Sequence, residues 1–257
     1  PPGLMLAGGH RGMTKPWEAT PAVGQLLAEV LGDTFAREQV SVVNGGLDLA
    51  RHFSTLKWDH LLYTGNTAVG KEVMRNAAQN LVPVTLELGG RNPTVFTEDA
   101  VTRDNVRIML GSKLTKNGQL CIAVNHVLVP ENSRDKFIGL VREVIEAAVG
   151  DYTTSPQVIE IGSPASAANP RRTPVTLVIN PAPEALVCQH EVFGPILPVH
   201  TYRQFDEVIE HIQAGERPLG IYIFSNQPEL VERLRRSTSS GGFCVNAASM
   251  QGAEANL

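Results

Sequence analysis

Two short stretches of the sequence could together carry out covalent chemistry. Glu87 begins the run Glu87-Leu88-Gly89-Gly90, and Cys121 ends the run Gly118-Gln119-Leu120-Cys121. A cysteine thiol can attack a carbonyl carbon, and a carboxylate can activate the water that later releases the product. The glycines let the backbone approach a small substrate closely. The combination predicts covalent catalysis at a carbonyl carbon.

A third stretch, Gly65-Asn66-Thr67-Ala68-Val69-Gly70-Lys71, lies between a predicted strand and a predicted helix. Backbone N–H groups at such a helix start favour a phosphate. The stretch is nearly a P-loop, but Glu72 stands where that motif needs Ser or Thr, and its carboxylate would repel a triphosphate. An NTPase is therefore disfavoured. A dinucleotide remains compatible, although no G-x-G-x-x-G follows a strand, and a plain packing turn is the alternative.

The remaining reactive side chains give weaker signals. The three cysteines, Cys121, Cys188 and Cys244, are widely spaced and form no C-x-x-C pair, which indicates a reducing compartment and argues against a zinc site. We interpret Cys188 and Cys244 as small buried hydrophobic side chains. Glu87 ends an apolar strand, where burial of an unpaired carboxylate would be costly, and this favours a function for it. The seven histidines are scattered, and none is assigned to catalysis.

The elements that must position these residues alternate between strands and helices. As far as Leu88, the pattern predicts β-α-β-α-β with short connections, which is typical of a parallel sheet covered by helices. The predicted helices cover 19–31 and 67–80, and the predicted strands cover 39–43, 60–63 and 83–88.

Beyond Gly90 the alternation continues with different spacing, so we expect a domain boundary near Leu88. Apolar residues from Phe137 to Val149 recur with the period of a helix. The segment 153–172 is rich in Pro, Ser and Ala, and only 158–161 in it resembles a strand. The predicted helices cover 104–116, 135–149, 205–214 and 228–237, and the predicted strands cover 126–129, 175–179, 196–202, 220–225 and 242–246.

The composition is typical of a soluble globular protein. A chain of 257 residues with 42% hydrophobic and 19% charged residues can form one large α/β domain or two smaller ones. The net charge of −4 gives no electrostatic case for nucleic acid or an anionic membrane. No apolar run is long enough to cross a bilayer, and the first residues do not resemble a secretory signal. We expect a cytoplasmic enzyme without a nucleic-acid or membrane partner.

Five motifs in one order make this sequence similar to the aldehyde dehydrogenase superfamily. They are Lys15-Pro16-Trp17-Glu18, Gly65-Asn66-Thr67-Ala68-Val69-Gly70, Glu87-Leu88-Gly89-Gly90, Gly118-Gln119-Leu120-Cys121 and Glu191-Val192-Phe193-Gly194-Pro195. Within the superfamily, residues 59–93 most resemble the coniferyl-aldehyde dehydrogenase branch. The resemblance covers nearly the whole chain. It implies an α/β fold, with a Rossmann-like parallel-sheet cofactor domain over 1–88 and an α/β catalytic domain over 89–257.

The resemblance also implies roles for single residues. Cys121 matches the nucleophile that forms a thiohemiacetal with an aldehyde, and Glu87 matches the base that activates water to hydrolyse the resulting thioester. The cofactor contacts that the resemblance implies are Lys15 and Glu18 at the adenosine ribose, Gly65 and Asn66 at the diphosphate, and Glu191 and Phe193 at the nicotinamide ribose and ring.

From the residues alone, two of these cofactor contacts have other readings. Glu18 could equally be a carboxylate favoured by the first turn of a helix, and Phe193 could be a core side chain. With the resemblance, the Glu18 carboxylate should repel a 2′-phosphate, so NAD is the expected cofactor and NADP is possible. The resemblance further implies an aldehyde substrate, possible aromatic and coniferyl-like chemistry, no metal, and a homo-oligomer, either a dimer or a tetramer.

The sequence departs from the family in several places. Compared with the family, we expect three parts to be missing: an N-terminal segment ending in a Trp-Asn motif, one helix within 151–171, and a C-terminal Pro-Phe-Gly-Gly stretch. Four residues are unusual beside their motifs: Trp17, Asn66, Arg91 and His190. At the position of Asn66, for example, the family usually has Ser. A catalytically impaired dinucleotide-binding relative is therefore an alternative. A Cys-dependent esterase or an acyl-transferring dehydrogenase is another.

Overall fold

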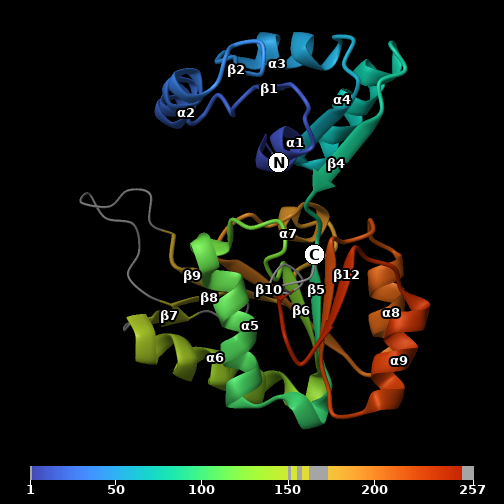
Figure 1. Cartoon of the computed structure of the whole chain (residues 1–257). Coiled ribbons are helices and arrows are strands. Elements are labelled where there is room, and N and C mark those ends of the chain that lie inside the picture. The colour runs from blue at the N-terminus through green and yellow to red at the C-terminus, as the bar shows by residue number, and fades with distance from the viewer. Residues whose placement is uncertain (1, 150–151, 155–157, 162–172, 251–257) are drawn as a thin grey trace. The chain divides into compact units, whose positions relative to one another are not determined.

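The chain folds as two units, which meet between Glu87 and Leu88. The computed structural model describes residues 2–149, 152–154, 158–161 and 173–250. Unit 1 is Pro1–Glu87 and unit 2 is Leu88–Leu257. Both combine helices with parallel strands, so the predicted α/β class is confirmed (Figure 1).

Unit 1 contains two separate pairs of strands instead of the single sheet that the sequence predicted. β1 (Gly12–Thr14) pairs in parallel with β2 (Val40–Val42), and β3 (Leu61–Gly65) pairs with β4 (Val84–Leu88). The helices are α1 (Pro2–Ala7), α2 (Pro21–Thr34), α3 (Leu47–Ser54) and α4 (Thr67–Ala78).

The helix α3 explains part of this difference. The sequence analysis placed no element between β2 and β3, because α3 is short and starts directly after a glycine turn. Its Phe53 packs against Trp58 with ring centroids 4.7 Å apart, and both rings lie on a small core around Leu61 and Ala77. Thus α3 packs against α4, α4 packs against β3, and α2 packs against β2.

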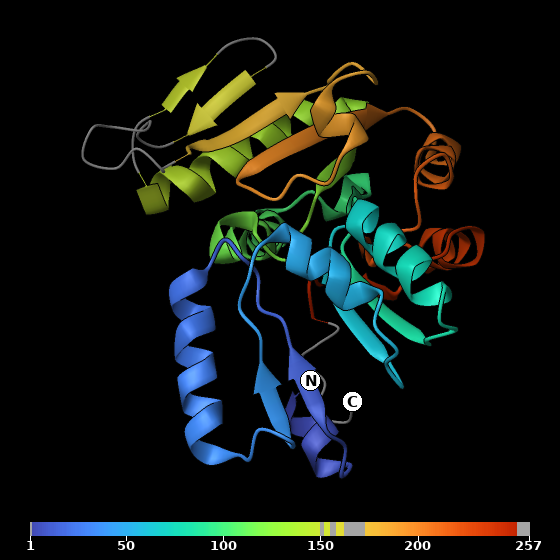
Figure 2. The ribbon, with the colours of Figure 1, turned by 90° about the horizontal axis from the view of Figure 1, so that it is seen from above.

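An eight-stranded sheet lies at the centre of unit 2, in the order β12-β11-β5-β6-β10-β9-β8-β7. From β12 to β9 neighbouring strands are parallel. At the end of the sheet, β8 is antiparallel to β9 and β7 is antiparallel to β8. Figure 2 shows β7 and β8 as the yellow strands at the edge of the sheet. The strands are β5 (Pro93–Phe96), β6 (His126–Pro130), β7 (Tyr152–Thr154), β8 (Val158–Ile161), β9 (Val175–Ile179), β10 (Ile196–Tyr202), β11 (Gly220–Phe224) and β12 (Gly242–Val245).

Helices cover both faces of this sheet (Figure 1). Successive strand residues point to opposite faces, so Phe96 and Phe224 join one core while Val95 and Ile223 join the other. The first core packs under α5 and α6, and the second packs under α8 and α9. The helical segments are α5 (Arg103–Leu114), α6 (Arg134–Val149), α7 (Leu186–Gln189), α8 (Phe205–Gln213), α9 (Pro228–Ser237) and the 3₁₀ turns η1 (Glu98–Ala100), η2 (Thr115–Gly118) and η3 (Glu131–Ser133).

The sequence analysis missed β5, which lies between β11 and β6. This strand has only four residues, begins with Pro93 and contains the polar Thr94, so it carries little strand signal, yet all four residues are buried. Proline is tolerated at the first position of a strand. The strand at 158–161 is confirmed as β8. The rest of the unusual segment 153–172, apart from 153–154, lies outside the residues that the structure describes.

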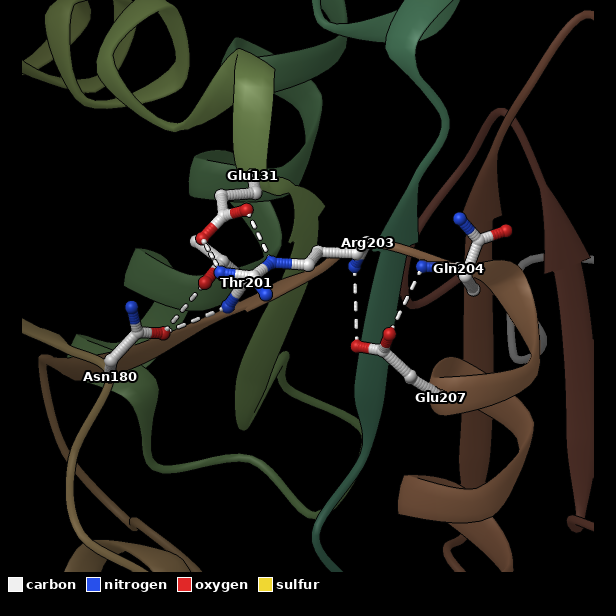
Figure 3. A network of polar contacts seen from close by, with 6 residues as sticks. All are labelled: Glu131, Asn180, Thr201, Arg203, Gln204 and Glu207. Carbon is white, nitrogen blue, oxygen red and sulfur yellow. Dashed lines mark hydrogen bonds and ion pairs between the residues drawn. The ribbon is translucent and has the colours of Figure 1, made fainter.

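Polar contacts join the carboxyl ends of three neighbouring strands of unit 2 (Figure 3). After β9, the side-chain oxygen of Asn180 accepts hydrogen bonds from the backbone N–H (2.9 Å) and the hydroxyl (3.2 Å) of Thr201. At the end of β10, the guanidinium of Arg203 donates to both carboxylate oxygens of Glu131, at 2.7 and 3.1 Å. Glu207 accepts from the backbone N–H of Arg203 at 3.2 Å. These residues therefore stabilise the carboxyl ends of the strands.

Candidate active site

The loops at the amino ends of the parallel strands carry most of the predicted site residues of unit 2. Cys121 precedes β6, and Glu191 and Phe193 precede β10. Because parallel strands begin at the same edge of a sheet, these loops gather there. Open α/β sheets more often bind ligands at the carboxyl ends of their strands, so general rules would not have selected this edge.

Cys121 follows a tight reversal of the chain. The predicted helix over 104–116 ends earlier, at Leu114, because three successive residues then adopt left-handed backbone conformations: Lys116 (φ 49°), Asn117 (φ 60°) and Gly118 (φ 78°). The reversal returns the chain from α5 toward the start of β6. The thiol side chain of Cys121 is exposed.

Asn92 holds the backbone around Cys121, the predicted nucleophile, and residues 118–123 are called the nucleophile turn after that prediction. The Asn92 side chain is 0% exposed, and its Nδ2 donates hydrogen bonds to the carbonyl of Cys121 (2.7 Å) and the carbonyl of Ala123 (3.0 Å). Its Oδ1 accepts a hydrogen bond from the backbone N–H of Gly220 at 2.8 Å. One buried amide thus ties the nucleophile turn to the start of β11. Asn92 was not among the residues singled out from the sequence, although a polar residue two positions after Gly90 and directly before Pro93 was a possible signal.

The backbone carbonyl of Ile122, the residue after Cys121, also accepts hydrogen bonds from distant side chains. Tyr222 and Ser249 donate hydroxyl hydrogen bonds to the carbonyl of Ile122, at 2.6 and 2.7 Å. Both donors are far from Ile122 in the sequence. The backbone around Cys121 is therefore anchored to the interior while the thiol remains accessible, as a nucleophile requires.

Gly118 allows the nucleophile turn to approach the loop that carries Glu191. Its φ of 78° is left-handed, and a Cβ there would lie 2.7 Å from the carbonyl carbon of Gly194 and 3.1 Å from the carbonyl oxygen of Lys113. Any side chain would push these segments apart. The predicted glycine turn before Cys121 thus serves a close backbone contact as well as a turn.

Glu191 lies over the glycine pair that follows Glu87. A Cβ on Gly89 would overlap the Glu191 carboxylate, which would then have to move from this position. Partial burial raises the pKa of Glu191 from its usual value, whereas the backbone N–H of Gly90 and the charge of Lys113 act in the opposite direction. Phe193, two residues further on, is 53% exposed, so its interpretation as a core side chain is wrong.

Glu87 is exposed. The prediction that it is a costly buried carboxylate, and therefore functional, is wrong in its premise. The residues of β4 alternate between half-buried and exposed positions, and Glu87 lies on the exposed face with Thr85. An alternating strand places every second side chain toward solvent, which the apolar sequence around Glu87 did not reveal. Glu87 is the last residue of unit 1, whereas Cys121 belongs to unit 2.

In unit 1, Asn66 caps the helix α4. Its Oδ1 accepts a hydrogen bond from the backbone N–H of Val69 at 2.9 Å, which is how Ser, Thr, Asp and Asn stabilise a helix start. A Cβ on Gly65 would overlap the ring of Tyr63, so the turn between β3 and α4 is closely packed. Asn66 therefore does what a serine at this position would do.

Lys15 and Glu18 form an ion pair with the ammonium nitrogen 2.5 Å from the carboxylate. The hydrogen bond from Lys15 is the main cause that lowers the pKa of Glu18. Glu18 also lies within electrostatic range of β3, because its charge contributes to the raised pKa of Tyr63, whose main cause is burial. The structure thus brings the two adenosine contacts implied by the resemblance together and places Glu18 near the turn that contains Gly65.

Three of the seven histidines converge in unit 2, which the sequence analysis did not foresee. The ring centroids of His126, His200 and His211 lie 4.9–5.7 Å apart, and the Nε2 atoms of His126 and His211 are 3.1 Å apart. Burial is the main cause that lowers all three pKa values, that of His126 well below its usual value and that of His200 to about 4. The nearby charge of Arg91 lowers them further.

The small cavity beside this cluster cannot hold a substrate. It has a volume of about 10 Å³ and is lined in part by Arg91, His126 and His211. Such a volume has room for about one water molecule. Among the residues that the structure describes, no group of His, Cys, Asp or Glu side chains could hold a metal ion.

The three cysteines are free thiols. Cys188 is buried as predicted, and Cys244 is partly buried against the core that packs under α5 and α6. Partial burial raises the pKa of Cys188. Within the described ranges, no helix combines the length and the apolar character that crossing a membrane would require.

Comparisons with known proteins agree on one family. The profile of the aldehyde dehydrogenase family matches residues 3–173 and 159–257. A probable coniferyl aldehyde dehydrogenase of Pseudomonas aeruginosa is 37% identical over 94% of this chain, which spans 56% of that relative. A substrate-bound Staphylococcus aureus AldH has a TM-score of 0.91 and 28% identity, covering 98% of this chain and 60% of its own. A Mycobacterium tuberculosis aldehyde dehydrogenase complexed with NAD+ shares the fold, with a TM-score of 0.81, 22% identity and coverage of 94% and 56%.

Proposed function

Because this chain belongs to the aldehyde dehydrogenase family, we propose that the protein oxidises an aldehyde to its carboxylic acid with a nicotinamide cofactor. The observation that carries the proposal is the nucleophile turn, in which the buried Asn92 fixes the backbone of an exposed Cys121. The proposed substrate is an aromatic aldehyde of the coniferyl type. Its support is the 37% identity to a probable coniferyl aldehyde dehydrogenase.

The residues present fit a dinucleotide. In unit 1, the carboxylate of Glu18 can accept hydrogen bonds from ribose hydroxyls, and the start of α4 at Asn66 offers backbone N–H groups to a diphosphate. In unit 2, Glu191 and the exposed ring of Phe193 can contact a ribose and a nicotinamide ring. The carboxylate of Glu18 disfavours a 2′-phosphate, so we propose NAD as the cofactor. Its ion pair with Lys15 offsets part of that negative charge, which keeps NADP as a second possibility.

The first chemical step belongs to Cys121. Its thiol gives its proton to solvent, and the sulfur attacks the aldehyde carbon to form a thiohemiacetal whose oxyanion can accept a hydrogen bond from the backbone N–H of Cys121. The bound nicotinamide supplies the acceptor for the hydride that leaves this carbon. Loss of the hydride converts the thiohemiacetal into a thioester on Cys121. The anchored backbone keeps the sulfur in place through both steps.

Glu87 completes the reaction in this proposal. Its carboxylate takes a proton from water, which attacks the thioester carbon and releases the carboxylic acid and the free thiol. The exposure of Glu87 supports access to water. Overall, one aldehyde, one water and one oxidised cofactor give one acid, one reduced cofactor and one proton.

Each unit has a proposed role of its own. Unit 1 carries residues of the cofactor domain, and unit 2 is the catalytic domain. We further propose that the protein is a cytoplasmic homo-oligomer, either a dimer or a tetramer. The three free thiols support a reducing compartment. Light scattering during size-exclusion chromatography will measure the oligomeric state.

The central test measures formation of reduced nicotinamide cofactor by the full-length protein that carries this sequence. Coniferyl-type and aliphatic aldehydes are compared, each with NAD+ and with NADP+. We expect turnover with an aromatic aldehyde and its loss in Cys121→Ala, because no other side chain supplies the attacking sulfur at this turn. Cys244→Ala is the matched control and should retain activity.

Binding separates the alternatives. If the wild-type protein binds NAD+ but oxidises no aldehyde, the proposed reaction is wrong and the protein is a cofactor-binding relative without this chemistry. If it cleaves esters through Cys121 without any cofactor, it is an esterase. Activity that survives Cys121→Ala would contradict the role of the thiol.

A further inference from the structure

Lys113 is a buried cation whose amine makes no hydrogen bond within the described part of the chain. It lies in the last turn of α5, its side chain is 0% exposed, and its Nζ has no acceptor. Burying an ammonium group is costly unless an anion compensates for it. A lysine in this position therefore calls for a nearby carboxylate.

Glu191 is the carboxylate whose charge acts on Lys113, although the two side chains form no direct hydrogen bond. Burial lowers the pKa of Lys113 to about 8, and the charge of Glu191 opposes this effect. Burial likewise raises the pKa of Glu191, which the N–H of Gly90 and the charge of Lys113 oppose. Each group therefore helps the other to remain ionised. The sequence analysis gave no role to Lys113.

Backbone packing keeps the two residues close to each other. Across Gly118, the carbonyl of Lys113 and the carbonyl group of Gly194 approach each other so closely that no side chain would fit between them. Gly194 belongs to the same loop as Glu191. On the other side of this carboxylate, Gly89 leaves the space that the carboxylate occupies. Gly118 thus lets the end of α5 approach the loop that carries Glu191, and Gly89 leaves space for the Glu191 carboxylate.

We propose that Lys113 is a positioning residue, whose buried ammonium keeps the Glu191 carboxylate ionised over Gly89 and Gly90 so that it can accept hydrogen bonds from the ribose of a nicotinamide nucleotide. This inference rests on the proposed function, because the family resemblance assigns the ribose contact to Glu191. An ionised carboxylate accepts from both ribose hydroxyls, whereas a protonated one must use one oxygen as a donor. Lys113 acts through Glu191 and does not touch the cofactor.

The first test is the dissociation constant of NAD+, measured by calorimetry near pH 6 and near pH 8. Lys113→Met keeps the length of the side chain but removes its charge, so Glu191 should protonate at a higher pH. We expect weaker binding by about tenfold near pH 6 and little change near pH 8, since one pKa unit changes the ionised fraction up to tenfold. In a Glu191→Gln background, Lys113→Met should add less than about twofold, because the group through which it acts is absent.

The control is Lys136→Met, which removes an exposed lysine from α6 and should leave NAD+ binding unchanged at both pH values. Lys113→Gln is used if Lys113→Met does not fold, with the same expected pH dependence. An equal loss of affinity at both pH values, or an equal effect of the substitution with and without Glu191, would overturn the inference.

The second test needs no cofactor. The free energy of unfolding is measured for the wild type, Lys113→Met, Glu191→Gln and the double variant. We expect the double variant to be more stable than the sum of the single effects predicts, because each single substitution leaves the other charge without the one that offsets it. Additive effects would overturn the coupling whatever the protein binds. Non-additive effects in a protein that does not bind NAD+ would contradict the proposed function and the cofactor role of Lys113, but not the ion pairing.

Discussion

At the residue scale, a few polar side chains decide where the reactive groups lie. Asn92 is the most heavily used of these, since its amide group makes three hydrogen bonds to backbone groups around the nucleophile turn. Glu18 differs from Asn92, because a role for Glu18 was already predicted from the sequence. Its role was expected from the motif, but its partner Lys15 changes the electrostatics of that role, because the two charges offset each other.

Asn92→Ala should both destabilise the protein and slow catalysis. It leaves two carbonyls and one N–H group without their partner in a buried site, and each such group costs about 1–3 kcal/mol. We therefore expect the free energy of unfolding to fall by about 3 kcal/mol, with a lower kcat because the backbone of Cys121 is released. Urea unfolding and steady-state kinetics measure these effects. Asn226→Ala, at an exposed position, is the control, and an equal loss of stability there would refute the special role of Asn92.

Glu18→Gln should shift cofactor preference toward NADP+. The substitution removes a carboxylate that disfavours a 2′-phosphate and releases Lys15 to bind that phosphate. The ratio of kcat/KM for NADP+ to that for NAD+ should rise about tenfold, which corresponds to about 1.4 kcal/mol. Glu29→Gln, on an exposed face of α2, serves as the control. A ratio that does not change would show that Glu18 does not face the adenosine ribose.

At the element scale, the periodic helices and the longer strands were predicted well, whereas short elements were missed. α6 and α8 follow the predicted ranges closely because their apolar residues recur with helical spacing. β5 and α3 were missed because each is short and adjoins Pro or Gly residues. The end of α5 was predicted two residues too late, since a run of left-handed residues has no strong sequence signal apart from Gly118.

The cap of α4 can be tested by comparing two substitutions of Asn66. Asn66→Ala removes the hydrogen bond to the N–H of Val69 and should lower the free energy of unfolding by about 1 kcal/mol. Asn66→Ser, the residue usual in the family, should restore most of this loss. Thermal unfolding and NAD+ binding are measured for both variants. If serine is as harmful as alanine, the side chain does not act as a cap.

At the scale of the whole molecule, the fold gathers side chains that the sequence keeps far apart. His126, His200 and His211 come from two strands and a helix, and their rings meet beside Arg91 in unit 2. Their lowered pKa values mean that the folded protein holds all three rings neutral at neutral pH.

This cluster should make unit 2 sensitive to acid. Below the usual histidine pKa of about 6.5, the unfolded chain takes up protons that the folded chain does not, so stability falls as the pH drops from about 6.5 toward the folded values, about 4 for His200. Each histidine can contribute up to about 1.4 kcal/mol per pH unit in this window. Chemical unfolding at several pH values measures how steeply the free energy of unfolding falls as the pH drops. This dependence on pH should be weaker for His200→Phe than for the wild type. His52→Phe, at an exposed position, should keep the wild-type dependence.

The sequence by itself determined the family motifs, the place of Cys121 within one of them and the alternation of helices and strands, because these depend on residue type and on spacing along a short stretch of chain. Only the tertiary structure decided which side chains meet. Asn92 reaches Gly220, Tyr222 reaches Ile122, and the charge of Glu191 acts on Lys113, each across a long separation in sequence. The order of strands in a sheet and the edge at which loops gather depend on such distant contacts. A local pattern carries no information about them, so the hydrogen bonds of Asn92, the buried Lys113 and the histidine cluster became visible only in the fold.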